Sequence, residues 1–293
     1  MGISHFRNRQ AQWLDLVALV IVCCAGWTLR GMLLFGDDLI PGLNGAYYLV
    51  QARAILRSGL PGIPDFPLLF YLHAAWAGLM SFVLPRDQAL IAAVKLTDTV
   101  VPVLLVIPVF MFVRSFAREH KVANNTFIAT ITIGLITVLN SSLLRMLGDF
   151  QKNAAGLPAG LLMIYFIYRA TKYNRRHSYS LAVLFGVVSS ITHIGVIALC
   201  ATVIILFLVS SYFIKTLRKR VLITAIVVFF AFGIGLSIDL IFDQERVERL
   251  AGVVTSPSSI VRGPDSDMQR VPAPSPAGHG TPSFPDVILG LTL

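Results

Sequence analysis

Charged residues are scarce in this sequence: Asp, Glu, Lys and Arg together make up 13% of its 293 residues. A water-soluble domain of this length needs far more polar surface, so the composition argues against a soluble protein. Apolar residues take their place, at 56% of the chain with a mean hydropathy of +0.75. Cysteine is rare as well. Cys23, Cys24 and Cys200 all fall inside apolar runs, which argues against a disulfide or a metal site.

Several motifs of soluble enzymes are also missing. The sequence has no glycine-rich phosphate loop, no His/Cys metal spacing and no Gly-x-Ser-x-Gly motif. No internal repeat is visible, which weakens assignment to transporters built on repeats. No cleavable signal peptide is evident, so the first apolar run reads as an anchor. The net charge of +9 would by itself suggest nucleic acid. The basic residues lie in short clusters between apolar runs, however, so we predict no nucleic-acid partner.

The apolar runs are continuous and long enough to cross a bilayer, at about 20 residues each. Transmembrane strands would alternate instead, so we predict an all-α, polytopic membrane helical bundle. It should have about seven transmembrane helices. They cover residues 12–35, 89–113, 124–144, 153–171, 178–193, 194–214 and 221–242.

Two further helices are expected in the membrane interface, within a large first outer loop at about 36–88. The apolar segment 66–84 is flanked by prolines, so we expect it to lie along the surface or re-enter rather than cross. The segment 44–58 is too short and too mixed to span, and reads as an amphipathic helix. Its apolar residues at helical spacing are Tyr47, Val50, Ala54 and Ile55.

Basic clusters fix the expected orientation. If 66–84 does not cross, every strong cluster of Lys and Arg falls on one side, which predicts a cytoplasmic N-terminus. The clusters are Arg7 and Arg9; Arg114, Arg118 and Lys121; Arg169, Lys172, Arg175 and Arg176; and Lys215, Arg218, Lys219 and Arg220. Residues 1–243 then form the transmembrane module. Residues 244–293 are a Pro/Gly/Ser-rich extracytoplasmic loop or tail, whose apolar end at 287–293 reads like the start of a further span.

Ionisable residues gather at three outer turns under this topology. They are Arg30, Asp37, Asp38 and Arg53 around the first loop, Arg145, Asp149, Lys152 and Asn153 between the third and fourth spans, and His193 between the fifth and sixth. Carboxylates there can act as a general base or hold a divalent cation, and basic residues can stabilise a departing phosphate.

Plainer interpretations stand beside each of these. Asp37 and Asp38 could be a solvated loop, and Asp149 could simply pair with Arg145 or Lys152. Lys95 and Asp98 lie one helical turn apart, so we expect them to neutralise each other. An aromatic group could form an interface belt or hold an isoprenoid tail. It comprises Tyr47, Tyr48, Phe66, Phe70, Tyr71 and Trp76.

The order of these features resembles the GT-C fold of polyprenyl-phosphate-dependent glycosyltransferases. That superfamily includes oligosaccharyltransferases, protein O-mannosyltransferases and aminoarabinose transferases. The resemblance covers roughly residues 12–242. It rests on the acidic outer loop with its Tyr47-Tyr48 helix, the Pro67-Leu68-Leu69-Phe70-Tyr71-Leu72 segment, the span with Lys95 and Pro102, and the Gly148-Asp149-Phe150 turn.

The resemblance implies transfer of a sugar from a polyprenyl-phosphate donor to a glycan, lipid or protein acceptor, at the outer face of a bacterial plasma membrane. It puts the catalytic acids at Asp37 or Asp38 and at Asp149. A divalent cation (Mg or Mn) would sit at Asp38 and Asp149. Binding of the donor and acceptor falls to Arg30, Arg53, Arg145, Lys152, Asn153, His193, Tyr47 and Tyr48. In many relatives an acid immediately precedes the Tyr-Tyr helix, where this chain has Asn44.

Two other functions stay open at this point. A transporter or flippase for a lipid-linked or anionic solute would want ionisable residues at the bilayer midplane, where Lys95 and Asp98 are the nearest examples. A non-catalytic subunit or inactive relative would explain Asn44, because asparagine cannot serve as a base.

Overall fold

The computed structural model describes residues 2–242 apart from residues 43, 64, 120–126, 149 and 214–217. The tail 244–293, the catalytic candidate Asp149 and the orientation-setting Lys121 and Lys215 lie outside the described residues. Within the described ranges the chain is helical and has no strand, as predicted. Its helices are α1 (Gly2–Phe35), α2 (Gly45–Ser58), α3 (Leu68–Met80), α4 (Arg86–Val100), the 3-10 helix η1 (Pro102–Leu105), α5 (Val106–Glu119), α6 (Phe127–Val138), α7 (Ser141–Arg145), α8 (Gln151–Tyr173), α9 (Arg176–Ser190), α10 (Ile194–Tyr212) and α11 (Arg218–Phe242).

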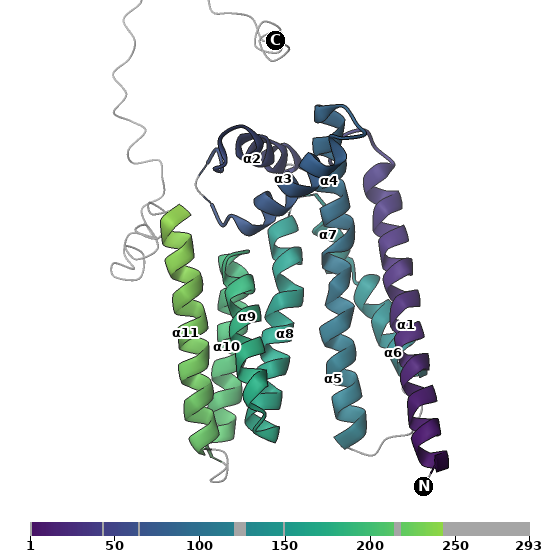
Figure 1. Cartoon of the computed structure of the whole chain (residues 1–293), viewed down its shortest axis with the longest axis vertical. Coiled ribbons are helices and arrows are strands. Elements are labelled where there is room, and N and C mark those ends of the chain that lie inside the picture. The colour runs from purple at the N-terminus through teal and green to yellow at the C-terminus, as the bar shows by residue number, and fades with distance from the viewer. Residues whose placement is uncertain are drawn as a thin grey trace, which may run out of the picture. The chain divides into compact units, whose positions relative to one another are not determined.

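The long helices run side by side, and the short helices α2 and α3 lie at one end of them (Figure 1). We call this end the α2–α3 end. Helix α8 is central, since it contacts α5, α9, α10 and α11, while α1 packs on α4, α5 and α6. The apolar stretch of α8 is 61% buried, against 22–28% for the other long apolar helices. Residues on α8 are therefore the best placed to connect α5 with α9, α10 and α11.

Among the described residues, four helical stretches are long and apolar enough to cross a membrane, which is consistent with a helical membrane protein. They are Trp13–Phe35, Arg86–Ala117, Phe127–Arg145 and Gln151–Tyr173. Shorter apolar helices are Leu68–Met80, Gly195–Ser210 and Arg220–Gly235.

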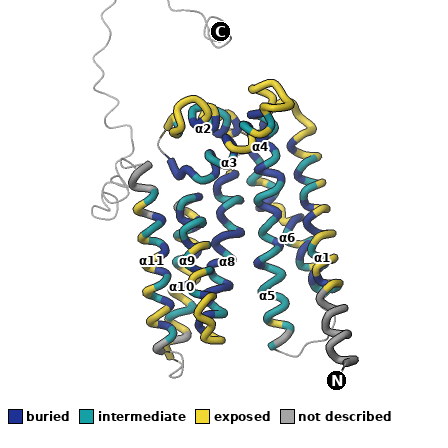
Figure 2. The backbone as a smooth tube through the Cα atoms, viewed as in Figure 1, coloured by how far each residue is buried: buried dark blue, intermediate teal, exposed yellow. Residues whose placement is uncertain are grey.

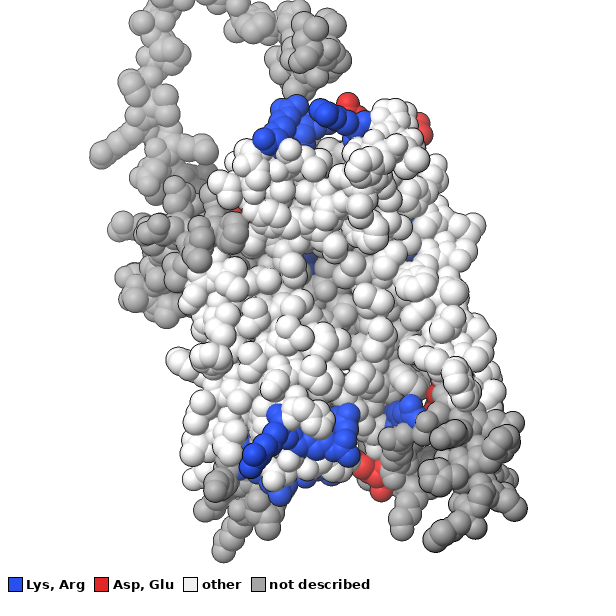
Figure 3. Space-filling model, viewed as in Figure 1, with Lys and Arg blue, Asp and Glu red and all other residues white. Residues whose placement is uncertain are grey.

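Charge and burial follow the pattern of a membrane-embedded surface. On the face drawn in Figure 3, charged side chains gather at the two ends, with an almost uncharged band between them. Figure 2 shows exposed residues along the sides of the long helices as well as at their ends. Many of these are large and apolar, such as Leu206, Ile226 and Phe229. Such surface is stable in contact with lipid and unstable in water.

Two of the predicted spans are broken within their length. The span 89–113 consists of α4, η1 and α5, because Pro102 begins a 3-10 turn in its middle. The span 124–144 consists of α6 and α7, because Asn140 caps a new helix. Its side chain accepts hydrogen bonds from the backbone N–H groups of Ser142 (2.9 Å) and Leu143 (3.2 Å). A residue that caps a helix competes with continuation of the preceding one.

The predicted interfacial helix at 44–58 is present as α2, but its buried face differs from the predicted one. Tyr48, Gln51, Ala52 and Ile55 are buried, whereas Val50 is 55% exposed. The helix packs against α3 and α4, so it turns its small and hydrogen-bonding residues inward. Gln51 fits there because its side chain bonds both the backbone N–H (3.0 Å) and C=O (2.8 Å) of Ile63.

Gly148 joins the loop after α1 to the turn before α8. Its φ is +73°, and a Cβ atom there would lie 1.8 Å from the carbonyl oxygen of Pro41.

Gly148→Ala is therefore expected to lower the free energy of unfolding by about 2–3 kcal/mol, through left-handed strain and displacement of the Pro41 loop. Denaturation with SDS in mixed micelles measures this change. Gly233→Ala is the matched control, since a Cβ at Gly233 meets nothing within 4 Å. Equal stability of the two variants would contradict the close approach.

Candidate functional site

A pocket of about 200 Å³ opens at the α2–α3 end, between the first turns of α2 and α8 and the turn before α10. It is lined by Asn44, Tyr47, Tyr48, Phe150, Lys152, Asn153 and His193. Five of these residues were named from the sequence as binding residues: Tyr47, Tyr48, Lys152, Asn153 and His193. They come from three separate turns, which the fold brings to one place. We call this pocket the Tyr-Lys pocket.

Tyr48 holds the two principal walls of the pocket together. Its hydroxyl accepts hydrogen bonds from the backbone N–H groups of Gln151 and Lys152, at the start of α8. The first N–H groups of a helix have no partner within the helix, so the tyrosine of α2 stabilises the end of α8. Tyr48 is buried, and this burial raises the pKa of its hydroxyl above the ordinary value. Tyr48 is therefore a neutral positioning residue in this pocket.

Lys152 is held from behind by a carboxylate that the sequence reasoning did not single out. Asp65 forms an ion pair with Lys152, accepts a hydrogen bond from the Tyr47 hydroxyl, and accepts one from the backbone N–H of Phe66 at 2.8 Å. The ammonium group of Lys152 also lies over the rings of Phe70 (5.3 Å) and Tyr47 (5.7 Å). The signal for Asp65 was its place before Phe66-Pro67, beside the Tyr-Tyr helix. Its partner lies 87 residues away, which no local pattern reveals.

Three other polar side chains lie in or near the pocket: two have buried atoms without a hydrogen-bond partner among the described residues, and one accepts a backbone hydrogen bond. Asn153 Oδ1 is buried and has no hydrogen-bond partner among the described residues. The side chain of Gln151 is 1% exposed, and neither of its polar atoms has a partner there. His193 Nδ1 accepts a hydrogen bond from the backbone N–H of Gly195 at 3.0 Å, which leaves the ring proton of the neutral imidazole on Nε2. The unmet acceptor on Asn153 suits a ligand hydroxyl or N–H group.

His73 lies on the buried face of α3, next to Tyr48. It is fully buried, and neither ring nitrogen has a hydrogen-bond partner among the described residues. Burial lowers the pKa of His73 to about 3, because the imidazolium would be charged with no compensating group.

A pH dependence follows from His73. An unfolded histidine takes up a proton near pH 6.5 and folded His73 does not. The free energy of unfolding should therefore be highest above about pH 6.5 and should decrease as the pH falls towards 3. We expect a loss of about 2 kcal/mol between pH 7 and pH 5. Thermal unfolding in detergent at these two pH values checks it. His73→Leu should remove most of this dependence, whereas His177→Leu, at an exposed site, should leave it unchanged. An identical pH profile for wild type and His73→Leu would contradict the buried, neutral state.

The predicted pairing of Lys95 with Asp98 was wrong. Lys95 does not neutralise Asp98. Its ammonium group donates to the backbone carbonyls of Asp37 and Asp38. Asp98 instead pairs with Arg30 at 2.7 Å, and its second carboxylate oxygen accepts from the backbone N–H of Gly148 at 2.8 Å. Although one turn apart on α4, the two side chains have separate partners: Asp98 pairs with Arg30 on α1, and Lys95 with backbone carbonyls of the loop that follows α1.

The remaining predicted site residues lie outside the Tyr-Lys pocket. Arg30 is 1% exposed and its guanidinium is occupied by Asp98 and by the carbonyl of Leu143. Asp37 and Asp38 are exposed in the loop after α1, and Arg145 is exposed at the end of α7. Arg53 pairs with Asp87 beside a different pocket. The close approach of Gly148 to Pro41 nevertheless brings the Asp37-Asp38 loop next to the turn at Gly148.

The aromatic group does not form a uniform belt. Tyr48, Phe66 and Phe70 are buried, with exposed fractions of 4% or less, while Trp76 is 39% exposed. The Tyr47 and Phe70 rings meet edge to face with centroids 5.5 Å apart. These rings form a packed wall behind the pocket, and an interfacial role remains only for the more exposed members such as Trp76.

The described residues alone do not fit a divalent cation. Among them, no three His, Cys, Asp or Glu side chains come close enough to hold one, and Asp38 is exposed in its loop. Mg²⁺ takes six oxygen ligands, several of which are usually water or substrate phosphate and only one or two protein carboxylates. Of the two predicted ligands only Asp38 lies among the described residues.

No protein-family model matches the chain, and no characterised protein or solved structure shows significant similarity to it.

Proposed function

We propose that the chain is a membrane glycosyltransferase that moves a sugar from a polyprenyl-phosphate donor to an acceptor at the extracytoplasmic face. The observation that carries the proposal is the Tyr-Lys pocket. Residues from three turns, far apart in the sequence, line one concave site at one end of a membrane-embedded bundle. A buried lysine, an unmet amide oxygen and a wall of aromatic rings give that site the chemistry of a phosphate joined to a hydroxyl-rich group and a hydrocarbon chain.

The roles can be assigned residue by residue. Lys152 binds the donor phosphate and stabilises the charge that grows on it as the sugar leaves. Asn153 and His193 bind the sugar hydroxyl groups. Asp37 and Asp38 are the described carboxylates in the loop beside the pocket, and Asp38 acts as the general base for the acceptor. Both side chains are exposed, so this assignment requires the loop to close over the pocket when substrates bind.

The proposed topology has seven crossings: α1, α4 through α5, α6 with α7, α8, α9, α10 and α11. Helices α2 and α3 then lie in the outer interface, and the α2–α3 end is extracytoplasmic. The basic clusters, such as Arg175 and Arg176, lie at the opposite end of the bundle, which supports a cytoplasmic N-terminus. The charge-poor band of Figure 3 supports the depth of burial in the bilayer.

The test is sugar transfer in membranes that contain the full chain, with a panel of labelled polyprenyl-phosphate sugars. The double variant Asp37→Asn/Asp38→Asn is expected to lower transfer about 100-fold, as loss of a general base does. Asp87→Asn, also an exposed acid at the α2–α3 end, is the control and should keep transfer within twofold. Full activity of the double variant would remove these two carboxylates from the reaction.

A second function has one observation in its favour. Among the described residues no carboxylate lines the Tyr-Lys pocket, and Asn44 stands where many proteins of the resembling family carry an acid. A non-catalytic binder or flippase of a lipid-linked phosphate needs the lysine and the aromatic wall but no base. Binding of farnesyl phosphate without transfer from any donor sugar would favour this second function over the first.

A further inference from the structure

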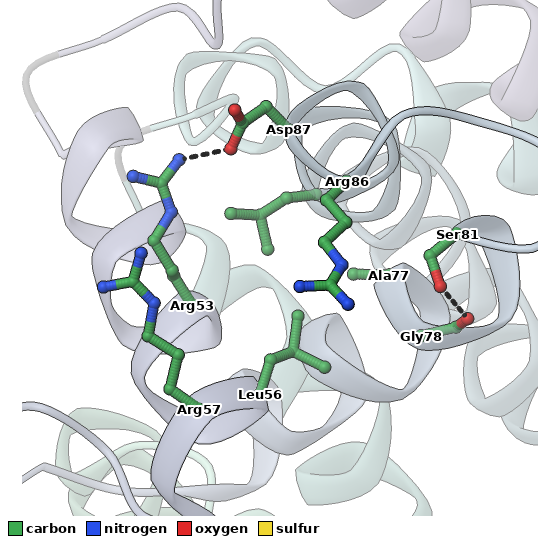
Figure 4. A pocket seen from close by; sticks show the side chains of 9 residues that line it. Arg53, Leu56, Arg57, Ala77, Gly78, Ser81, Arg86 and Asp87 are labelled. Carbon is green, nitrogen blue, oxygen red and sulfur yellow. Dashed lines mark hydrogen bonds and ion pairs between the residues drawn. The ribbon is translucent and has the colours of Figure 1, made fainter. Parts of the chain in front are cut away.

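A second pocket at the α2–α3 end collects all the basic residues of the first outer loop. Its volume is about 310 Å³, and it is lined by Arg53, Leu56, Arg57, Ala77, Gly78, Ser81, Arg86, Asp87 and Leu90 (Figure 4). Residues 36–88 contain three Lys or Arg residues in total, namely Arg53, Arg57 and Arg86, and all three line this pocket. It shares no lining residue with the Tyr-Lys pocket. We call it the triple-arginine pocket.

The three guanidinium groups come from two helices. Arg53 and Arg57 lie one turn apart on α2, and Arg86 is the first residue of α4. Figure 4 shows their side chains around one opening. Like charges at this spacing repel each other, so nothing in the fold of α2 alone favours the pair. Repulsion among the three guanidinium groups is unfavourable in the empty pocket, and a bound anion would relieve it.

One acid partly compensates the three arginines. Asp87 accepts a hydrogen bond from Arg53 at 2.8 Å, with both side chains well exposed. Arg57 and Arg86 have no ion pair or hydrogen bond among the described side chains, so two guanidinium groups stay available to a ligand. The first turn of α4 has no side-chain cap, so its backbone N–H groups add positive potential, which Asp87 in the same turn partly offsets.

We infer that the triple-arginine pocket binds a phosphate group at the membrane surface, independently of the sugar-transfer site. Guanidinium groups grip phosphate oxygens in pairs, which suits two free arginines facing one opening. The walls between them are apolar, through Leu56, Ala77 and Leu90, so the pocket accepts a phosphate that is attached to a hydrocarbon chain. The phosphate of an anionic lipid and a free diphosphate share this chemistry.

The experiment measures binding to the purified full chain in neutral detergent. The probes are dioctanoyl phosphatidic acid, inorganic pyrophosphate, and dioctanoyl phosphatidylcholine as the zwitterionic comparison. Arg57→Gln/Arg86→Gln removes the two free guanidinium groups and is expected to weaken phosphatidic acid binding at least tenfold. Arg175→Gln/Arg176→Gln removes the same charge from exposed residues at the start of α9, and should leave binding within twofold. Asp87→Asn should strengthen binding several-fold, because it releases Arg53 and removes a negative charge.

Each outcome has one meaning. A tenfold loss for both phosphatidic acid and pyrophosphate supports the site and shows that phosphate chemistry is sufficient. Loss for phosphatidic acid with no pyrophosphate binding supports the site with a lipid as its source. Equal binding by wild type and Arg57→Gln/Arg86→Gln, with matching unfolding temperatures, overturns the proposal. No sugar transfer enters these measurements, so they stand or fall apart from the glycosyltransferase proposal.

Discussion

Asp98→Leu is expected to lower the free energy of unfolding by about 3–5 kcal/mol, the range for breaking a buried ion pair by removing one partner. The reason lies in the network around Arg30. Its Nη2 donates to Asp98 Oδ1 at 2.7 Å, its Nε to the Asp98 carbonyl at 2.8 Å, and its Nη1 to the Leu143 carbonyl at 3.2 Å. Asp98 Oδ2 accepts from the Gly148 N–H. One pair therefore links α1, α4, α7 and the turn before α8.

The two single variants of this pair should differ. In Arg30→Met the remaining Asp98 can take up a proton, and so escape a buried charge. In Asp98→Leu the guanidinium of Arg30 stays charged, because arginine is not deprotonated in proteins. Arg30→Met should thus cost less than Asp98→Leu, and the double variant should cost less than the sum of both. SDS denaturation of the three variants measures these differences.

An exposed ion pair provides the control. The Arg53–Asp87 ion pair has an N–O distance of 2.8 Å, close to the 2.7 Å of Arg30–Asp98, but its side chains are 48% and 81% exposed. Arg53→Met and Asp87→Leu should change the stability by less than about 1 kcal/mol each. Additive effects of Arg30→Met and Asp98→Leu, or effects no larger than those of the exposed pair, would show that the buried network does not link the helices.

Much of the helical organisation was predictable from local pattern alone. Continuous apolar runs gave the positions of α1, α8 and α11 to within a few residues, apart from the N-terminal extension of α1, since a membrane-spanning helix satisfies its own backbone. The breaks inside 89–113 and 124–144 were missed, although Pro102 and Asn140 mark them. A proline or capping residue is tolerated within an apolar run when neighbouring helices supply the lost contacts.

Five of the seven lining residues of the Tyr-Lys pocket were named from the sequence, and their hydrogen-bond and ion-pair partners were not. Tyr47, Lys152 and His193 follow from a consistent topology, because turns on one side of a membrane meet at one surface. The pairing of Arg30 with Asp98 spans 68 residues, and that of Asp65 with Lys152 spans 87. Such pairs depend on helix rotation and tilt, which a hydropathy pattern does not fix. The assignment of Arg30 to a donor phosphate missed its buried role for this reason.

Lys152→Met is expected to reduce sugar transfer about 1,000-fold and to abolish retention of farnesyl phosphate, if Lys152 carries the donor phosphate. The residue suits this role because it is held in one place. Asp65 pairs with its ammonium group, which also lies over the rings of Tyr47 and Phe70. A preorganised charge stabilises a developing negative charge more than a flexible surface lysine does, because little reorganisation accompanies the reaction.

Two further variants make the result specific. Lys172→Met removes a lysine from the opposite end of the same helix, where it pairs with Glu119, and should leave transfer within twofold. Asp65→Asn keeps the Lys152 charge but loosens its position, so transfer should fall about tenfold while farnesyl phosphate still binds. Full transfer by Lys152→Met together with complete loss in Asp65→Asn would move the essential role from the lysine to the carboxylate. Asp65 would then be the acid of the first outer loop on which the reaction depends.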